Sequence, residues 1–218
     1  MTTQKLTVAL PNGTLLADAC ALLARAGLSR VRPEDFDRVL LVDDGDAVYV
    51  KVRPTDVPVY VELGGADIGI VGKDMLWEAH GDVYELVDLR FGHCRLVLAA
   101  PARSPLAHGE WPPALRVATK YPRAARTFFD RLGIAVELIK LHGSIELAPL
   151  TGLSDAILDI TATGTTLRAN DLVEVVEAAR STARLIVNHA SLKTRSAAVD
   201  AYAATLRRTV GEPAPTAG

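Results

Sequence analysis

The stretch SDAILDITATGTTLRAN, residues 154–170, combines two carboxylates with several small hydroxyl side chains. Asp159 lies in an apolar run that predicts a β-strand, and Asp155 comes just before that run. A helix can begin after the small residues that follow the strand: Thr161, Ala162, Thr163, Gly164, Thr165 and Thr166. Backbone N–H groups at such a junction bind anions, and carboxylates accept hydrogen bonds from sugar hydroxyls. The stretch therefore predicts a ribose phosphate site, although a Thr-capped helix after an ordinary strand gives the same pattern.

Segments with strand and helix patterns alternate along the chain, which predicts an α/β fold with mostly parallel sheets. Strands are expected at 6–10, 38–42, 47–52, 66–72, 83–89, 94–100, 115–119, 135–140, 156–160, 172–179 and 183–188. Helices are expected at 15–27, 55–65, 73–79, 121–133, 144–152 and 193–210. In such folds ligands lie at the carboxyl ends of strands, so we expect the functional residues there.

The composition narrows the class of protein. The 218 residues suit one large domain or two small ones, and the net charge of -2 argues against general nucleic-acid binding. The chain shows neither a secretory signal nor an apolar run long enough to span a bilayer. Its two cysteines, Cys20 and Cys94, lack the spacing of a zinc site, and Cys20 is expected in the core. These features predict a cytoplasmic protein that does not bind membranes.

Several stretches in the same order resemble one known family. DAILDITATGTTLRAN resembles the phosphoribosyl-pyrophosphate loop of ATP phosphoribosyltransferase, the enzyme that opens histidine biosynthesis. The resemblance covers about residues 5–210 and includes DVPVYVELGGADIGIVGKDML, DLRFGHCRLVLA, VATKYPRAARTFF and GSIELAPLTGLSDAI. Several ordered motifs are far more specific than one Thr-Gly loop.

The resemblance implies two lobes, similar to type II periplasmic binding proteins, with the active site in the cleft between them. Residues 1–92 and 181–210 would form the first lobe, and residues 93–180 would form the second lobe with its phosphate loop. The final helix would pack on the first lobe, and residues 211–218 would be a disordered tail. The length resembles the short form of the family, which works with a regulatory subunit similar to histidyl-tRNA synthetase. We also expect a homodimer when the chain is alone.

The family reaction joins N1 of ATP to C1 of phosphoribosyl pyrophosphate and releases pyrophosphate, with Mg²⁺ carried on the substrate and no metal site on the protein. Two polyanionic substrates need cations. The resemblance assigns Arg38, Arg53 and Lys73 to catalysis. It assigns to substrate binding the loop residues above together with Asp155, Asp159, Glu146, Arg95, Lys120, Asn12, Gly13 and Thr14. For each charged residue a solvated surface position is the alternative, and Arg123 could contact phosphate or nothing.

The first glycine turn, ALPNGTLL, departs from the family pattern. The family usually has a lysine where this chain has Asn12 and an arginine where it has Thr14. Ala162 also lacks a polar group that the phosphate loop often carries. Neighbouring cations could compensate for the lost charges. Otherwise the chain would be a weakened or repurposed member, and a two-lobe binding module for a small molecule is a further alternative.

Overall fold

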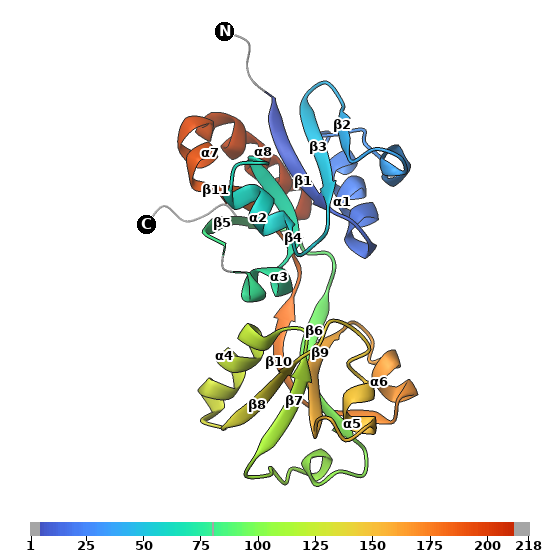
Figure 1. The fold of residues 1–218 in the computed structure, drawn as a ribbon. Helices are drawn as coiled ribbons and strands as arrows, with labels where there is room; N and C mark the ends of the chain where they lie inside the picture. Colours follow the sequence, from blue (N-terminus) through green and yellow to red (C-terminus); the bar gives the residue numbers. More distant parts are fainter. Residues whose placement is uncertain (1–4, 80, 212–218) are drawn as a thin grey trace. The chain divides into compact units, whose positions relative to one another are not determined.

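Two β-sheets, each with helices packed on it, organise the chain in a computed structural model that describes residues 5–79 and 81–211 (Figure 1). Unit 1 contains the described residues up to Gly92 and those from Thr182 onward. Unit 2 contains the continuous segment His93–Ser181. The chain thus leaves unit 1 once and returns to it once, and the expected α/β class is confirmed.

The sheet of unit 1 has the strand order β2-β3-β1-β4-β11-β5 among the described residues. The strands are β1 (Leu6–Pro11), β2 (Leu41–Asp43), β3 (Ala47–Val52), β4 (Ile68–Gly72), β5 (Val83–Asp88) and β11 (Ala183–Asn188). β3, β1 and β4 run parallel, whereas β2, β11 and β5 are antiparallel to their neighbours. The carboxyl ends of β1, β3 and β4 therefore lie at one edge of this sheet.

Helices bury both faces of the unit 1 sheet. Alternate residues of β1 point to opposite faces: Val8 and Leu10 join a core with helices α1 (Thr14–Arg25) and α8 (Ser196–Val210). Ala9 points the other way, toward helix α2 (Val57–Glu62). A Cβ on Gly69 would lie 2.8 Å from a methyl carbon of Val61, so α2 can pack this closely only on a glycine. The unit is completed by α3 (Lys73–Glu78), α7 (His189–Thr194) and the 3₁₀ turn Pro33–Phe36.

The sheet of unit 2 has the order β10-β6-β9-β7-β8. Its strands are β6 (Cys94–Pro101), β7 (Leu115–Thr119), β8 (Val136–Lys140), β9 (Ala156–Thr161) and β10 (Leu172–Ser181). β9, β7 and β8 are parallel, while β6 is antiparallel to both β9 and β10. The helical segments are α4 (Pro122–Leu132), α5 (Leu147–Leu150), α6 (Thr165–Ala169) and the 3₁₀ turn Pro105–His108. One core joins Val97 and Ile157 of the sheet to Leu167 of α6.

Three sequence expectations need correction. The sheets are mixed rather than mostly parallel. The hairpin strand β2 is antiparallel to β3, and the strands next to the two points where the chain passes between the units, β6, β10 and β11, also pair antiparallel with their neighbours. The expected strand 38–42 begins only at Leu41, and residues 38–40 are exposed. The expected helix 193–210 is two helices, separated at Arg195. The predicted disordered tail falls on residues that lie, apart from Gly211, outside the described ones.

The break at Arg195 has a visible cause. Its backbone is not helical (φ −129°, ψ 25°), and its Nη1 donates to Asp67 Oδ2 at 2.7 Å and to Lys5 O at 3.0 Å. Asp67 also accepts hydrogen bonds from Thr7 N (2.8 Å) and from the hydroxyl of Ser191 (2.6 Å). The ion pair and its hydrogen bonds thus fix the junction between α7 and α8 to the start of β1.

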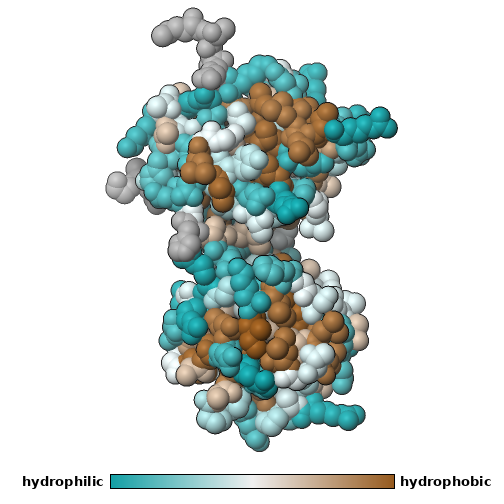
Figure 2. Space-filling model, viewed as in Figure 1, coloured by the Kyte–Doolittle hydropathy of each residue, from teal (hydrophilic) through white to brown (hydrophobic). Residues whose placement is uncertain are grey.

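Apolar side chains also reach the surface of each unit, where Figure 2 shows brown areas on the viewed face. In unit 1 the exposed fractions of Leu40, Leu41 and Leu63 are 67%, 57% and 79%. In unit 2 Leu147 and Leu150 of α5 are 54% and 52% exposed. These side chains lie outside the cores described above.

Candidate functional site

One edge of the unit 2 sheet gathers most of the predicted binding residues. β7 and β9 are parallel neighbours, so Lys120, which follows β7, and the loop that follows β9 lie at the same edge. β6 runs the opposite way and places Arg95, near its start, directly across from Thr161. Asp159 pairs with Val97, two residues from Arg95 on β6, so Asp159, Thr161 and Arg95 share one face of the sheet.

The loop 161–166 is shaped by one left-handed glycine. Gly164 has φ +72° and stands as the residue before α6, and its N–H donates to the Thr161 hydroxyl at 2.8 Å. A side chain in this left-handed conformation would cost about 1 kcal/mol or more. Beyond the glycine, the hydroxyls of Thr163 and Thr165 lie 2.9 Å apart. The exposed part of the loop therefore offers hydroxyls and the first N–H groups of a helix to solvent, as an anion site requires.

Asp159 is a buried carboxylate close to this loop. It is 8% exposed, and its Oδ1 accepts a hydrogen bond from Ile160 N at 2.9 Å. Burial raises the pKa of Asp159, and the charge of Lys120, whose Nζ lies 3.4 Å from Oδ2, opposes that rise. Glu146 is close enough for its charge to raise the pKa further. Two other predicted binding residues, Lys120 and Glu146, thus interact with Asp159.

Asp155 does not join them. It precedes β9 and so lies at the opposite end of the strand from the loop, about 13 Å from Asp159 at the usual rise per residue. Its carboxylate pairs with Arg116, with Nη2 to Oδ1 at 2.8 Å and the Arg116 N–H to Oδ2 at 2.9 Å. The expected pair of carboxylates beside the phosphate loop is therefore wrong. Asp155 instead forms an ion pair with Arg116, a residue to which the sequence analysis gives no role.

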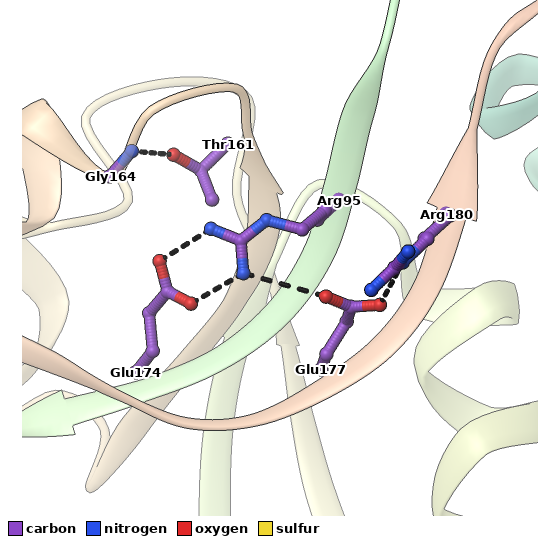
Figure 3. Close-up of polar contacts among 6 residues, drawn as sticks. All are labelled: Arg95, Thr161, Gly164, Glu174, Glu177 and Arg180. Carbon is purple, nitrogen blue, oxygen red and sulfur yellow. Dashed lines mark hydrogen bonds and ion pairs between the residues drawn. The ribbon is translucent and has the colours of Figure 1, made fainter.

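Arg95 lies beside the loop and is held by acidic side chains of β10 (Figure 3). Its two Nη atoms bind the two carboxylate oxygens of Glu174 at 2.7 and 2.8 Å. Nη1 also lies 3.5 Å from Oε2 of Glu177. The other carboxylate oxygen of Glu177, Oε1, accepts a hydrogen bond from Arg180 Nε at 2.6 Å. The sequence reading missed Glu174 and Glu177. Their acidic character in an otherwise strand-like segment was the signal that could have found them.

The predicted residues of unit 1 gather at one edge of its sheet. Asn12, Gly13 and Thr14 follow β1, Arg53 follows β3 and Lys73 follows β4, and these three strands are parallel. The N–H of Asn12 donates to Val52 O at 2.8 Å, which places the turn next to the end of β3. Gly13 has φ +82° and ψ −146°, a conformation that favours glycine. Asn12 and Thr14 are exposed.

The predicted catalytic cations of unit 1 differ in their surroundings. Lys73 is half-buried and forms an ion pair with Glu85. Arg53 is exposed, and its carbonyl accepts the N–H groups that open α2. Arg38 was expected to open a strand, but it lies in an exposed bend three residues before β2. The carbonyl of Leu40 nevertheless accepts a hydrogen bond from Lys51 N at 2.8 Å, which ties this segment to the end of β3.

Cys20 is buried in α1, as expected, and burial raises the pKa of its thiol to about 11.

Among residues 5–79 and 81–211, no group of three or more His, Cys, Asp or Glu side chains is placed to hold a metal ion. Within the same residues the longest apolar helical segments are too short or too polar to cross a membrane.

Fold and site together define an α/β protein of two units in which a strand–Thr/Gly–helix loop presents hydroxyls and backbone N–H groups beside a buried carboxylate. A family model described as ATP phosphoribosyltransferase matches residues 53–208. An ATP phosphoribosyltransferase of Rubrobacter xylanophilus is 48% identical over 93% of this chain and 95% of its own length. One of Deinococcus radiodurans is 50% identical over 93% of this chain and 89% of its own. The chain belongs to the ATP phosphoribosyltransferase family.

Solved structures agree with this assignment. The ATP phosphoribosyltransferase (HisG:HisZ) complex of Thermotoga maritima contains a chain with a TM-score of 0.79 and 33% identity. The match covers 95% of this chain and all of that one. The periplasmic aliphatic sulphonate binding protein SsuA of Escherichia coli has a TM-score of 0.61 at 12% identity and covers 96% of this chain and 74% of its own. The second likeness shows that the fold is shared with periplasmic binding proteins.

Proposed function

We propose that the chain transfers the 5-phosphoribosyl group of phosphoribosyl pyrophosphate to N1 of ATP, as the first step of histidine biosynthesis. The observation that carries the proposal is the loop 161–166 beside Asp159 and Arg95, in a chain that belongs to this family. In the reaction a bond forms between N1 of adenine and C1 of the ribose while the bond from C1 to the pyrophosphate oxygen breaks.

Unit 2 is assigned the phosphoribosyl group. The hydroxyls and N–H groups of the loop 161–166 would bind the 5-phosphate, and Arg95 and Lys120 would add positive charge. Asp159 would accept hydrogen bonds from the ribose hydroxyls, which would supply partners to a carboxylate that burial has already stripped of most of its water. Hydrogen bonds to a charged group contribute about 1.5–3 kcal/mol each. Glu146 would reach the same sugar.

In this proposal unit 1 binds and stabilises the anionic groups of the reactants. Arg38, Arg53 and Lys73 would stabilise the charge that develops on the departing pyrophosphate, with Mg²⁺ carried on the substrate oxygens. The turn of Asn12, Gly13 and Thr14 would offer backbone N–H groups to phosphate at the carboxyl end of β1. The protein supplies mainly position and electrostatic stabilisation, since the reaction needs no covalent bond to the enzyme.

The test is a coupled assay with ATP, phosphoribosyl pyrophosphate and Mg²⁺ that follows phosphoribosyl-ATP by its absorbance and by mass. The proposal expects product only when both substrates are present, and expects Asp159→Asn to reduce the rate. A folded protein that binds both substrates but forms no product, with or without a partner subunit, would exclude the transferase function.

A weakened or repurposed family member is the second candidate, and one observation favours it. Asn12 and Thr14 are exposed at the edge that carries Arg53 and Lys73, yet neither supplies the charge usual in the family. The backbone of the turn is nevertheless formed, because Asn12 donates to Val52 O and Gly13 takes its left-handed conformation. A measurable rate that is orders of magnitude below that of a relative carrying both charges would support this candidate.

We also propose a regulatory partner similar to histidyl-tRNA synthetase, together with a homodimer in its absence and a location in the cytoplasm. The likeness to a chain of a HisG:HisZ complex, over that chain's whole length, supports the partner. Histidine should barely inhibit the isolated chain and should inhibit it strongly after the partner is added. Initial rates with and without each component test this, and strong inhibition of the chain alone would contradict it.

A further inference from the structure

The strand β10 carries two irregularities that change which side chains face Arg95. Its pairing with β6 shifts between Glu174 and Val176 and again between Glu177 and Ala179. Residues three apart on a regular strand point to opposite faces. Each shift inserts one extra residue, so Glu174, Glu177 and Arg180 pair with Ala99, Val97 and Arg95, which alternate regularly along β6. All three side chains therefore lie on the face that carries Arg95.

The contacts of Arg95 leave one edge of its guanidinium group open. Glu174 takes one N–H from each Nη atom, and Glu177 lies against Nη1. Among the described residues, Nε and the second N–H of Nη2 have no hydrogen-bond partner. In Figure 3 this edge points to the side on which Thr161 and Gly164 lie, and Thr161 pairs directly with Arg95 across β6 and β9. Two parallel donors on a planar group match a phosphate.

Glu174 itself packs against the loop. A Cβ built on Gly164 would lie 3.0 Å from Glu174 Oε1 and 2.9 Å from Arg168 Nη1. Arg95 in turn holds the pKa of Glu174 below its usual range through their hydrogen bonds, so the carboxylate stays charged near neutral pH. A negative charge so close to an anion-binding loop would weaken binding if its charge were its only effect.

We propose that Glu174 is a positioning residue: it fixes Arg95 so that the open Nε and Nη2 edge of the guanidinium faces the phosphate held by the loop 161–166. This inference rests on the proposed function of that loop. The alternative is plain electrostatics, in which Glu174 merely cancels positive charge. The two alternatives predict opposite effects of removing the Glu174 charge. The positioning role predicts weaker phosphate binding, and plain electrostatics predicts tighter binding.

The experiment measures the Kd of phosphoribosyl pyrophosphate by calorimetry in Mg²⁺ buffer, on the full chain. Glu174→Gln breaks the two-point pair, and the positioning role expects binding to weaken by about fivefold or more although a negative charge is lost. Glu177→Gln is the matched control, because it removes the same charge from the same strand face but touches Arg95 only through a 3.5 Å contact; its 2.6 Å hydrogen bond is to the exposed Arg180. Its Kd should stay within about twofold of the parent.

Two further variants separate geometry from charge and from folding. Glu174→Asp keeps the charge but is too short for the same pair, so it should also weaken binding. In an Arg95→Gln background, Glu174→Gln should add no further loss, because Glu174 acts through Arg95. Thermal unfolding of each variant checks that the compared proteins are folded, and Glu174→Asp serves if Glu174→Gln does not fold.

The outcomes are distinct. The positioning role is overturned if folded Glu174→Gln or Glu174→Asp binds as tightly as the parent or tighter. It is also overturned if Glu174→Gln and Glu177→Gln have equal effects, or if the losses caused by Glu174→Gln and Arg95→Gln are additive. If Arg95→Gln weakens binding and Glu174→Gln does not, the loop keeps its proposed function and only this inference fails. If the parent binds no phosphoribosyl pyrophosphate, or neither Gly164→Ala nor Arg95→Gln affects its binding, the proposed function of the loop fails as well.

Discussion

Asp155 and Asp159 belong to the same stretch of chain but occupy opposite electrostatic environments. Hydrogen bonds from Arg116 lower the pKa of Asp155, whereas burial raises the pKa of Asp159 despite the nearby Lys120. A carboxylate with a lowered pKa adds stability above its unfolded-state pKa. One with a raised pKa adds stability only at low pH and loses it as the pH rises through its folded-state pKa. Near neutral pH the charge on Asp155 therefore favours folding, and the charge on Asp159 opposes it.

Asp159→Asn should separate stability from activity. It removes a buried charge, so the Tm at pH 8 should be equal to or higher than that of the parent. It also removes charge-assisted hydrogen bonds to the ribose, so kcat/KM should fall about tenfold or more. Thermal scans from pH 4 to pH 8 and initial rates measure both quantities. A lower Tm at pH 8 with full activity per folded molecule would make Asp159 a structural residue.

Asp155→Asn is the control on the same strand. It breaks the ion pair with Arg116, so the Tm at neutral pH should fall, and the difference from the parent should shrink as the pH drops through the lowered pKa of Asp155. The folded fraction should keep its kcat/KM, because Asp155 lies at the far end of the strand from the loop. Loss of activity equal to that of Asp159→Asn would restore Asp155 to the binding site.

Asn12 and Thr14 lack the positive charges that are usual in the family, and restoring those charges shows whether their loss lowers kcat/KM. Asn12→Lys combined with Thr14→Arg returns two positive charges to the turn after β1. If the substrates' phosphates meet that turn, kcat/KM should rise about tenfold, equivalent to about 1.4 kcal/mol of transition-state stabilisation. Both positions are exposed, so the Tm should change little. A parent that is already fast and gains nothing would show that cations such as Arg53 serve those phosphates.

At the scale of elements, the loop between β9 and α6 depends on Gly164 for two reasons. The residue has φ +72°, and a Cβ there would press on Arg168 and Glu174. Gly133, at the end of α4, has a similar φ of +66° but no atom within 4 Å of a built Cβ. The two positions thus share the backbone requirement and differ in what surrounds them.

Gly164→Ala and Gly133→Ala should therefore lose similar stability and differ in binding. Each substitution puts a side chain in the left-handed region, at about 1–2 kcal/mol. Only Gly164→Ala should weaken phosphoribosyl pyrophosphate binding, by about tenfold, because it also displaces the groups that line the loop. Denaturant titrations and calorimetry measure the two effects. Equal Kd values for both variants would remove the loop from the site.

Most elements could be predicted because their patterns are local. The strand, the Thr/Gly loop and the start of a helix at 156–166 are legible in consecutive residues, and the structure forms each of them. Features that depend on distant partners could not be predicted. The break at Arg195 follows from Asp67, far away in sequence, and the side chains facing Arg95 follow from register shifts in β10. The separation of Asp155 from Asp159, by contrast, follows from strand geometry alone, because the two residues lie near opposite ends of β9.

At the scale of the whole molecule, the loop 161–166 belongs to a unit made from one continuous segment. All five strands of the unit 2 sheet lie within His93–Ser181, and so does the core that joins Val97 and Ile157 to Leu167. The two ends of the segment are neighbours, because Cys94 pairs with Ser181 across β6 and β10. Unit 1 is assembled from two separate segments and receives unit 2 as an insertion, an arrangement in which the inserted unit can fold alone.

The segment 93–181 expressed alone should fold and keep the loop. We expect a cooperative thermal transition by circular dichroism, since no strand of its sheet is lost with unit 1. The Kd for phosphoribosyl pyrophosphate should stay within about tenfold of the full chain, because Asp159, Lys120, Arg95 and the loop are all retained. Transfer to ATP should be absent, because Arg53 and Lys73 are missing. The Asp159→Asn segment is the control for specific binding. A cooperatively folded segment with no affinity for phosphoribosyl pyrophosphate would show that unit 1 supplies the binding energy and that the loop is not the main anion site.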